Sequence, residues 1–400
     1  MRMPSHTLPR PLRLLGIAVM LGAGVSAHAK PGDTLQPYLL YNVTQDDNLF
    51  LLPTNESSDI YQQFGAGMQL DWKQSQQEVT GHLSANDTTF SKNSILDYSG
   101  YDMLGQWNWQ RGKQLLGQLG FTANRTLGTF LDTGNIDTQN TVDSSTKFFT
   151  GSYLIHPRWR INAALDTASY LYSATTLNYN NRVINHAQIS TDYLTPRGST
   201  LGIYAERWAG SYTNNQIICI LYTCGYVDNS YTENDIGVRG TWALDGKVQL
   251  NSTVAQTWRY YNQYTQRNFT GLTGTLGASW QATDKLQVNG SVYRNIGALL
   301  DTYASYSIND GVNLSPAWMI TQKIKLSATA FAERRSYLGD PFALGIFRDD
   351  RATGYSLTLN YQPREWASLS AIYQGQNRNS NFSVFNFSDQ SLSLSAQLIF

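Results

Sequence analysis

The chain has 400 residues, and 29 Lys and Arg balance 29 Asp and Glu, so its formal net charge at pH 7 is zero. This balance gives no electrostatic reason to expect a nucleic-acid partner. Charged residues make up only 14% of the chain, whereas aromatic residues reach 12%, with 25 Tyr and 10 Trp. The mean hydropathy is -0.35, and beyond the N-terminal region no apolar run approaches the ~20 residues of a transmembrane helix. Any membrane span must therefore be built from strands.

The N-terminal region has the features of a secretory signal peptide. Arginines precede an apolar run at residues 14–25, and Ala27-His-Ala29 then supplies a small-x-small cleavage pattern. The run is too short to span a bilayer comfortably, which disfavours the alternative of an uncleaved anchor. We therefore expect residues 1–29 to be a cleaved signal peptide and residues 30–400 to form an outer-membrane β-barrel.

Apolar and polar residues alternate along the whole mature chain. In segment 248–261, Leu250 and Val254 point one way, whereas Asn251 and Thr253 point the other. The same alternation is found at 79–90, 159–172 and 324–335. It is typical of strands with one apolar, lipid-facing side and one wet side. A soluble β-sandwich would need larger aliphatic residues on its buried face, whereas many outward positions here are Gly, Ala, Tyr and Trp.

Eight short turns alternate with nine longer, polar connections. The short turns lie near 73–76, 111–113, 157–158, 195–198, 245–246, 283–284, 320–322 and 363–365, and Trp or Tyr flanks most of them. The longer connections lie near 49–59, 91–97, 128–144, 174–181, 212–230, 262–267, 337–351 and 379–386, with a tighter one near 299–302. Aromatic residues beside short turns are typical of an interfacial girdle at the periplasmic rim. The pattern predicts an all-β fold, a transmembrane antiparallel up-and-down β-barrel of about 18 strands with both termini periplasmic.

One strand breaks the expected alternation. In segment 303–316, Asp310 falls on the lipid-facing side. A β-bulge at Asp310-Gly311 would restore the register, because a bulge inserts one extra residue into a strand.

The last ten residues alternate strictly and end on an aromatic residue. Leu392, Leu394, Leu398 and Phe400 share one face of this segment. A lipid-facing terminal aromatic residue is typical of the closing strand of an outer-membrane barrel. We expect Leu398 and Phe400 to form the assembly signal that the barrel-assembly machinery recognises.

Cys219 and Cys224 are the two cysteines of the chain, and they lie five residues apart in one long loop. In an oxidising compartment we expect them to form a local disulfide. The neighbourhood lacks companion metal ligands, so we expect no metal site there, and the sequence indicates no cofactor.

The inward-facing positions carry charges of both signs. The candidate lumen-lining residues are Arg160, Asp166, Glu206, Arg239, Arg259, Lys325, Glu333 and Arg335. They are expected to pair with one another, or alternatively to line a conduit for a charged polymer. Four inward aromatic residues, Tyr170, Tyr172, Tyr204 and Trp208, are candidates for stacking on sugar rings.

An enzymatic function is disfavoured. His186 and Ser190 share the inward side, as a catalytic pair would require, but only Asp192 is evident as an orienting acid. A barrel phospholipase also needs a lipid-facing site, which inward residues do not supply. We interpret these side chains as polar lining of the lumen.

Several short motifs carry a family resemblance. They are Gly32-Asp-Thr-Leu-Gln-Pro-Tyr38, Asp46-Asp-Asn-Leu-Phe50, Asp71-Trp-Lys-Gln-Ser75, Asn86-Asp-Thr-Thr-Phe90, Leu96-Asp-Tyr-Ser-Gly100, Trp107-Asn-Trp109 and His156-Pro-Arg-Trp159. With them the chain resembles the EpsL-type outer-membrane proteins of exopolysaccharide-biosynthesis operons, a group within the broader β-barrel porins. The resemblance is strongest over the first half of the mature chain.

The resemblance implies an outer-membrane protein that acts in exopolysaccharide biosynthesis or export as a porin-like conduit. Two alternatives remain open: a closed barrel that serves as a surface anchor or scaffold, and a general diffusion porin for small solutes. The expected partners are outer-membrane lipid and lipopolysaccharide, the barrel-assembly machinery, and polysaccharide with periplasmic export components.

Overall fold

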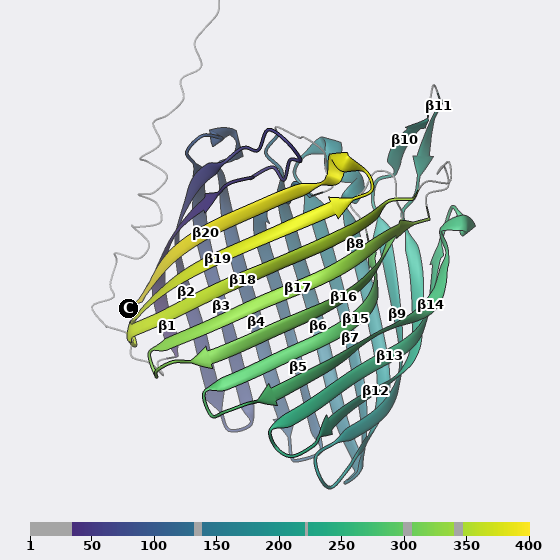
Figure 1. The fold of residues 1–400 in the computed structure, drawn as a ribbon. Helices are drawn as coiled ribbons and strands as arrows, with labels where there is room; N and C mark the ends of the chain where they lie inside the picture. Colours follow the sequence, from purple (N-terminus) through teal and green to yellow (C-terminus); the bar gives the residue numbers. More distant parts are fainter. Residues whose placement is uncertain (1–33, 132–137, 221–222, 299–305, 340–346) are drawn as a thin grey trace, which may run out of the picture.

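The computed structural model describes residues 34–131, 138–220, 223–298, 306–339 and 347–400. Eighteen strands form one antiparallel sheet, and the sheet is closed because β1 pairs with both β2 and β20 (Figure 1). The predicted 18-stranded barrel is thereby confirmed. The predicted signal peptide at 1–29 and the predicted tight connection at 299–302 lie outside the described residues.

Each barrel strand has between 12 and 16 residues. The strands are β1 (Leu35–Asp46), β2 (Asp59–Gln74), β3 (Gln77–Phe90), β4 (Tyr98–Arg111), β5 (Leu115–Leu127), β6 (Thr141–His156), β7 (Trp159–Tyr172), β8 (Arg182–Leu194), β9 (Thr200–Tyr212), β12 (Tyr231–Ala243), β13 (Val248–Tyr261), β14 (Phe269–Gln281), β15 (Leu286–Ala298), β16 (Tyr306–Met319), β17 (Ile324–Leu338), β18 (Asp349–Arg364), β19 (Ala367–Ser380) and β20 (Phe387–Ile399). Short 3-10 turns lie in the loops: η1 (Ser94–Leu96), η2 (Thr175–Asn180), η3 (Thr265–Arg267) and η4 (Ser383–Phe385). Among the described residues, no helix is long and apolar enough to cross a bilayer.

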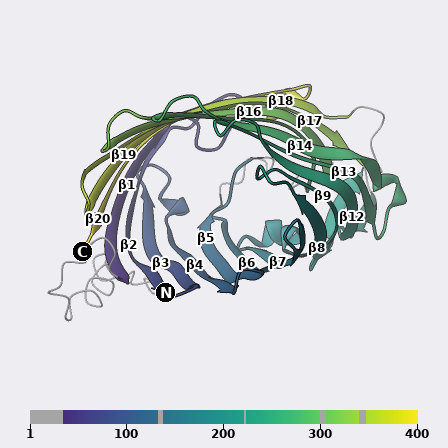
Figure 2. The same cartoon turned by 90° about the horizontal axis from the view of Figure 1, so that it is seen from below.

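The two ends of the barrel differ, and we call them the turn end and the loop end. Short connections such as 75–76, 157–158 and 365–366 close the turn end, whereas the longer connections lie at the loop end (Figure 1). Both chain ends of the barrel lie at the turn end, where the Phe400 amide donates to the Pro37 carbonyl at 2.8 Å. Seen from below, the strands form a flattened ring (Figure 2).

The longest connection contains structure that the sequence analysis did not anticipate. Within the expected loop 212–230, β10 (Gln216–Ile220) and β11 (Thr223–Val227) form a separate two-stranded hairpin. Figure 1 shows this hairpin standing away from the barrel wall at the loop end.

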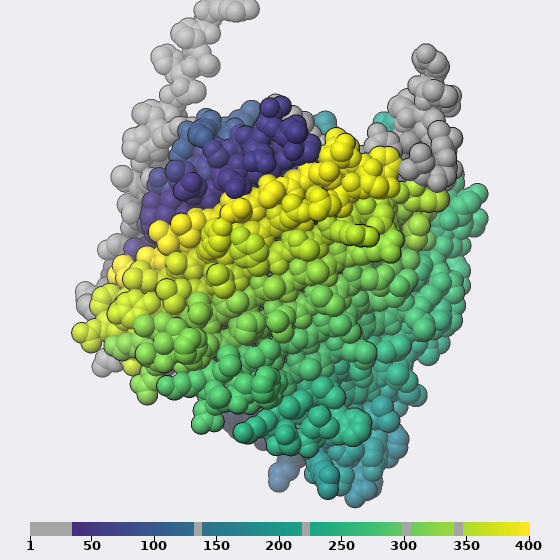
Figure 3. Space-filling model, in the orientation of Figure 1, coloured from purple at the N-terminus to yellow at the C-terminus, as the bar shows by residue number. Residues whose placement is uncertain are grey.

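The outer wall carries the apolar half of the alternation. Large apolar side chains stay exposed on successive strands, among them Leu83 at 49%, Leu201 at 65%, Ile236 at 61% and Leu272 at 61%. Figure 3 shows one outer face of the barrel as a continuous surface whose colours follow the strands in diagonal order from yellow to green. An apolar band around a closed barrel is the surface that a bilayer requires.

Exposed Trp residues gather at the turn end. They are Trp72, Trp107, Trp159, Trp242, Trp280, Trp318 and Trp366, each beside a short connection. Their position agrees with the interfacial girdle predicted from the sequence, because indole rings favour the boundary between lipid and water.

The predicted bulge at Asp310-Gly311 is wrong. The register of β16 against β15 and β17 is regular through both residues, so Asp310 does face outward. It lies near the loop end and accepts hydrogen bonds from Arg294 at 3.0 and 3.1 Å. The ion pair Arg334–Asp349 also lies near the loop end, at 2.9 Å. The prediction failed because the sequence does not give the depth of Asp310 in the barrel wall. A charged residue near the end of a strand needs no bulge when a residue on the neighbouring strand neutralises it.

Candidate functional site in the barrel lumen

A row of polar groups crosses four neighbouring strands near the turn end. Arg160 lies opposite Asp192, Asp192 opposite Gly202, and Gly202 opposite Arg239. The Arg239 guanidinium donates from Nε to Asp192 Oδ1 and from Nη2 to Oδ2, both at 2.9 Å. On the other side, Arg160 Nη2 donates to Asp192 Oδ2 at 3.0 Å. One carboxylate therefore holds two arginines, in a geometry that favours strong, directional bonds.

Gly202 makes this arrangement possible. Arg239 and Asp192 are on strands that are not adjacent, since β9 runs between β8 and β12. A Cβ atom on Gly202 would collide with Asp192 Oδ1 and with the Thr191 carbonyl. The missing side chain leaves the space through which the carboxylate and the guanidinium meet above β9.

A second row lies closer to the middle of the barrel and centres on His186. Asp166, His186 and Trp208 are directly opposite one another on β7, β8 and β9. His186 Nδ1 lies 2.6 Å from Asp166 Oδ1, and its Nε2 lies 3.2 Å from Glu206 Oε2. The Trp208 ring stacks on the imidazole with the ring centroids 3.7 Å apart. Two carboxylates and one aromatic face therefore fix the imidazole ring.

The ionisable side chains of these two rows, together with Gln188, which bridges them, form what we call the lumenal charge cluster: Arg160, Asp166, His186, Gln188, Asp192, Glu206 and Arg239. Gln188 donates to Glu206 at 2.7 Å and accepts from Arg239 at 3.4 Å. Two arginines face three carboxylates, so the cluster carries one net negative charge with a neutral His186 and none with a protonated one. The cluster is therefore a paired network and not a basic surface, which agrees with the pairing expected from the sequence.

The His–Ser arrangement that the sequence analysis weighed is not assembled. Ser190 accepts a hydrogen bond from Asn162 at 3.2 Å, whereas both ring nitrogens of His186 are engaged by carboxylates. The expectation that only Asp192 was available as an orienting acid is wrong, because Asp166 and Glu206 contact His186. Finding them from the sequence would require the exact register of β7 and β9 on β8.

Arg259 is buried near the loop end. Its side chain is 4% exposed, its Nε donates to Glu233, and its guanidinium lies 4.4 Å from the centre of the Tyr231 ring. Glu233 lies opposite both Trp208 and Arg259 in the sheet, so this pair extends the His186 row onto β12 and β13.

Arg259 also lies beside a part of the barrel wall where two neighbouring strands, β14 and β15, are not hydrogen-bonded to each other. β14 pairs with β15 only over Gly274–Gln281, so the loop-end residues of β14 have no ladder to β15. There Arg259 Nη1 donates to the Gly297 carbonyl at 3.4 Å. Phe269 and Tyr306 pack edge to face across the same place, with ring centroids 5.8 Å apart. Aromatic packing and one arginine thus replace the missing backbone hydrogen bonds.

Two further candidates lie on β17. Arg335 donates to Glu333, and Glu333 also accepts from the Tyr293 hydroxyl at 2.6 Å. Lys325 is exposed near the turn end, and within the described part of the chain it makes no ion pair. Of the predicted inward basic residues, Arg160, Arg239, Arg259 and Arg335 are therefore compensated by carboxylates.

The candidate sugar-stacking residues are largely engaged by the protein itself. Trp208 stacks on His186, the Arg182 guanidinium lies 4.3 Å from the centre of the Tyr170 ring, and Tyr204 is only 9% exposed. Tyr172 is half-buried at the end of β7. Their role in binding sugar stays a prediction.

The structure describes the backbone at the predicted disulfide and the side chains of the predicted assembly signal. Cys219 and Cys224 are opposite each other in the β10–β11 hairpin, although their side chains lie outside the described residues. Leu398 is 40% exposed and Phe400 is 43% exposed, on the apolar side of β20. Both functional assignments stay predictions.

No protein-family model matches the chain, and a search of curated proteins gives no match. Solved structures do resemble it. The outer membrane protein opdK from Pseudomonas aeruginosa gives a TM-score of 0.51 at 11% sequence identity, covering 92% of this chain and 99% of that one. OccK2 (OpdF) from the same organism gives 0.50 at 9% identity, covering 92% and 98%. A structure of OpdK with vanillate gives 0.50 at 11% identity, covering 92% and 99%. At such low identity these likenesses establish the fold.

Proposed function

We propose that the chain is a porin-like channel of the outer membrane that passes small polar solutes. The observation that carries this proposal is the division of one closed 18-stranded wall into an apolar outer face and a charged, hydrogen-bonded inner face. Barrels of this strand number are wide enough for an aqueous channel. The fold that the chain shares with the OpdK and OccK2 structures supports the general diffusion porin over the polysaccharide conduit.

The lumenal charge cluster is the proposed selectivity element. It lines one wall from the turn end to the middle of the barrel, and its opposing charges lie side by side on β7, β8, β9 and β12. Because the charges nearly cancel, the wall attracts neither anions nor cations strongly. It instead offers donors and acceptors to the hydroxyl, amide and carboxylate groups of a passing solute.

The structure of OpdK with vanillate suggests one class of solute to test. Vanillate is a small aromatic carboxylate, and arginine and Tyr or Trp side chains are the groups that bind such a molecule. In the lumenal charge cluster of this chain, Arg160 and Arg239 are already paired with Asp192, and Trp208 is stacked on His186. A small aromatic carboxylate should therefore pass at a rate similar to that of a neutral sugar of equal size.

Swelling of liposomes that contain the purified protein tests the proposal. Small sugars and vanillate should enter and swell the vesicles, and the rate should fall as the solute becomes larger. Vesicles without protein, and vesicles with heat-unfolded protein, are the controls. Failure of every small solute to enter would refute the channel and leave the closed scaffold.

The EpsL-type resemblance supports an alternative function, a role in exopolysaccharide export. The chain would then conduct a polymer or hold it as a surface scaffold. Deleting the gene in the producing cell and measuring secreted polysaccharide separates these readings from the solute channel, because a diffusion porin is not needed for polymer secretion.

The proposal includes a cellular placement. The turn end would face the periplasm and the loop end the cell surface, after export by the signal peptide and insertion by the barrel-assembly machinery. The apolar outer wall would contact outer-membrane lipid and lipopolysaccharide. Protease treatment of intact cells tests this orientation: cleavage should occur in loop-end connections such as 47–58, and not in the short turns.

A further inference from the structure

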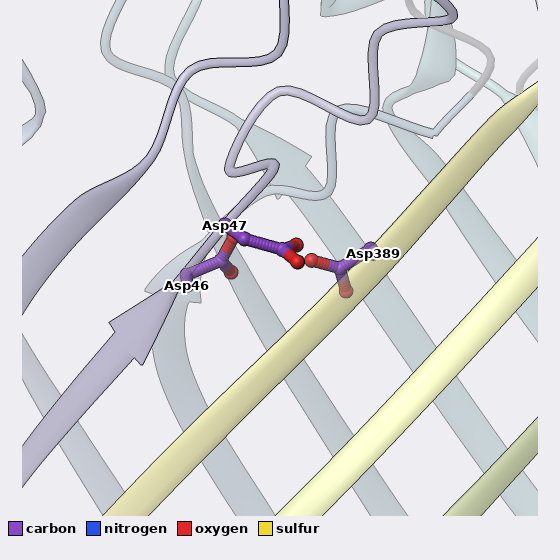
Figure 4. Close-up of side chains that lie close together, drawn as sticks. All are labelled: Asp46, Asp47 and Asp389. Carbon is purple, nitrogen blue, oxygen red and sulfur yellow. The ribbon is translucent and has the colours of Figure 1, made fainter.

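Three carboxylates meet where the barrel closes at its loop end. Asp46 is the last residue of β1, Asp47 follows it, and Asp389 lies near the start of β20 (Figure 4). One oxygen from each side chain lies within 4.8 Å of the others. Figure 4 shows the carboxylate of Asp389 directed at that of Asp47. The first and last strands of the barrel thus bring three carboxyl groups to one point.

The described residues place no basic side chain beside this group, which we call the acidic triad. Within the described residues, no Lys or Arg forms an ion pair with any of the three. Asp389 is only 5% exposed, and its Oδ1 is buried without a hydrogen-bond partner. Its other oxygen accepts one long bond from Gln376, at 3.4 Å. A buried, unpaired carboxylate oxygen that faces two further carboxylates is costly unless a cation or a shared proton joins it.

Backbone amides of neighbouring residues hold two of the three carboxylates in place. The Asn48 amide donates to Asp46 Oδ1 at 2.9 Å, and the Gln390 amide donates to Asp47 Oδ1 at 2.7 Å. Each bond fixes one carboxylate through one oxygen and leaves the second oxygen able to coordinate a cation. The Asn48 side chain bonds to the Ser388 carbonyl at 2.8 Å and so holds the loop on β20.

We propose that Asp46, Asp47 and Asp389 bind a divalent cation of the calcium type, which fastens the closing seam of the barrel. Hard carboxylate oxygens are the ligands that Ca²⁺ prefers, and water would complete its shell of about six to eight oxygens. Mg²⁺ is usually held by one or two carboxylates in a stricter geometry, so Ca²⁺ should bind more tightly. This inference does not depend on whether the barrel conducts solutes.

The test compares thermal unfolding of the purified protein in EDTA and in excess CaCl₂, followed by heat-modifiable migration in detergent gels. Ca²⁺ should raise the unfolding midpoint of the unmodified protein by a few degrees or more, because a ligand that binds only the folded state stabilises it. Asp47→Asn and Asp389→Asn should abolish this rise. In EDTA, Asp389→Asn should unfold at or above the temperature of the unmodified protein, since it removes repulsion.

Glu56→Gln is the matched control, because it removes one carboxylate from the same loop, 47–58, at an exposed position outside the triad. It should keep the full Ca²⁺ effect. Titration calorimetry with CaCl₂ and with MgCl₂ should show binding that both Asp variants lose. An unchanged midpoint with no heat of binding would overturn the proposal, as would an equal Ca²⁺ effect in the Asp variants. A triad that shares a proton in place of a metal would respond to pH and not to Ca²⁺, which would also overturn it.

Discussion

Asp192 binds the guanidinium of Arg239 through both of its carboxylate oxygens, at 2.9 Å each, although β9 runs between their strands. Arg160 binds the same carboxylate from the other side at 3.0 Å. Arg160 and Arg239 are therefore neutralised by a carboxylate, as in the first of the two arrangements that the sequence analysis considered, and not left as a lining for a charged polymer. Loss of the Asp192 carboxylate would therefore leave both arginines without this partner.

Asp192→Asn should shift the ion selectivity of the channel toward anions by a few-fold, because two arginines then lack their carboxylate. Arg239→Gln should shift it the other way, toward cations. The reversal potential across a bilayer in a KCl gradient at about 0.1 M measures both, where screening acts over ~10 Å. Arg207→Gln is the control, since Arg207 is exposed on the outer side of β9. Shifts of the same sign in both lumenal variants would contradict the paired arrangement.

Gly202→Ala should disrupt the same pair without removing a charge. The new methyl group would collide with the Asp192 carboxylate, and overpacking of this kind typically costs about 1–3 kcal/mol. We expect a lower free energy of unfolding in urea, together with altered ion selectivity. Gly290→Ala is the matched control, because the nearest atom to its new Cβ would lie 3.7 Å away. Equal stability of the two variants would show that the Gly202 space is not needed.

The alternation of β13 predicts opposite responses to arginine on its two sides. Val254 is 38% exposed on the outer side at mid-strand, so Val254→Arg should cost about 2–4 kcal/mol in a lipid bilayer. Leu250 lies opposite Trp242 near the turn end, so Leu250→Arg should cost only about 0–1 kcal/mol. Thr253→Arg, on the lumenal side, should fold normally. Urea titrations of folding in lipid vesicles give these free energies. A Thr253→Arg variant as unstable as the Val254→Arg variant would contradict the assignment of Thr253 to the lumenal side of β13.

Deletion of Phe400 should reduce assembly of the barrel in cells. The residue is exposed on the lipid side, and its amide bonds to the Pro37 carbonyl at the seam. Outer-membrane levels and heat-modifiable migration provide the measurement. Phe400→Tyr keeps an aromatic end and should assemble well, so equal loss in both variants would assign the defect to something other than the missing ring.

The sequence predicted the fold well because the apolar-polar alternation is a local property. This alternation and the turn residues are enough to predict the strand number and the position of the Trp girdle. They also predict that Val254 faces outward and Thr253 faces the lumen. The pairing of the lumenal charges does not, because it depends on register across the sheet. Asp166 lies opposite His186, and Asp192 opposite Gly202, only in one register, and shifting a strand by one residue breaks both rows.

Two other features could not be predicted for related reasons. The bulge expected at Asp310 was wrong because one sequence contains no information on depth or on the Arg294 that lies opposite it. The acidic triad joins residues more than 340 positions apart, and it exists only because β1 and β20 close the barrel. Such contacts depend on the topology of the sheet and have no local sequence pattern.

Single-channel recording of the purified protein in a planar bilayer tests the central claim most directly. If the barrel is a porin-like channel, the protein should add discrete conductance steps, and the Asp192→Asn variant should add steps whose ion selectivity is shifted toward anions. A protein that migrates as a folded, heat-modifiable barrel but adds no conductance steps would contradict the channel.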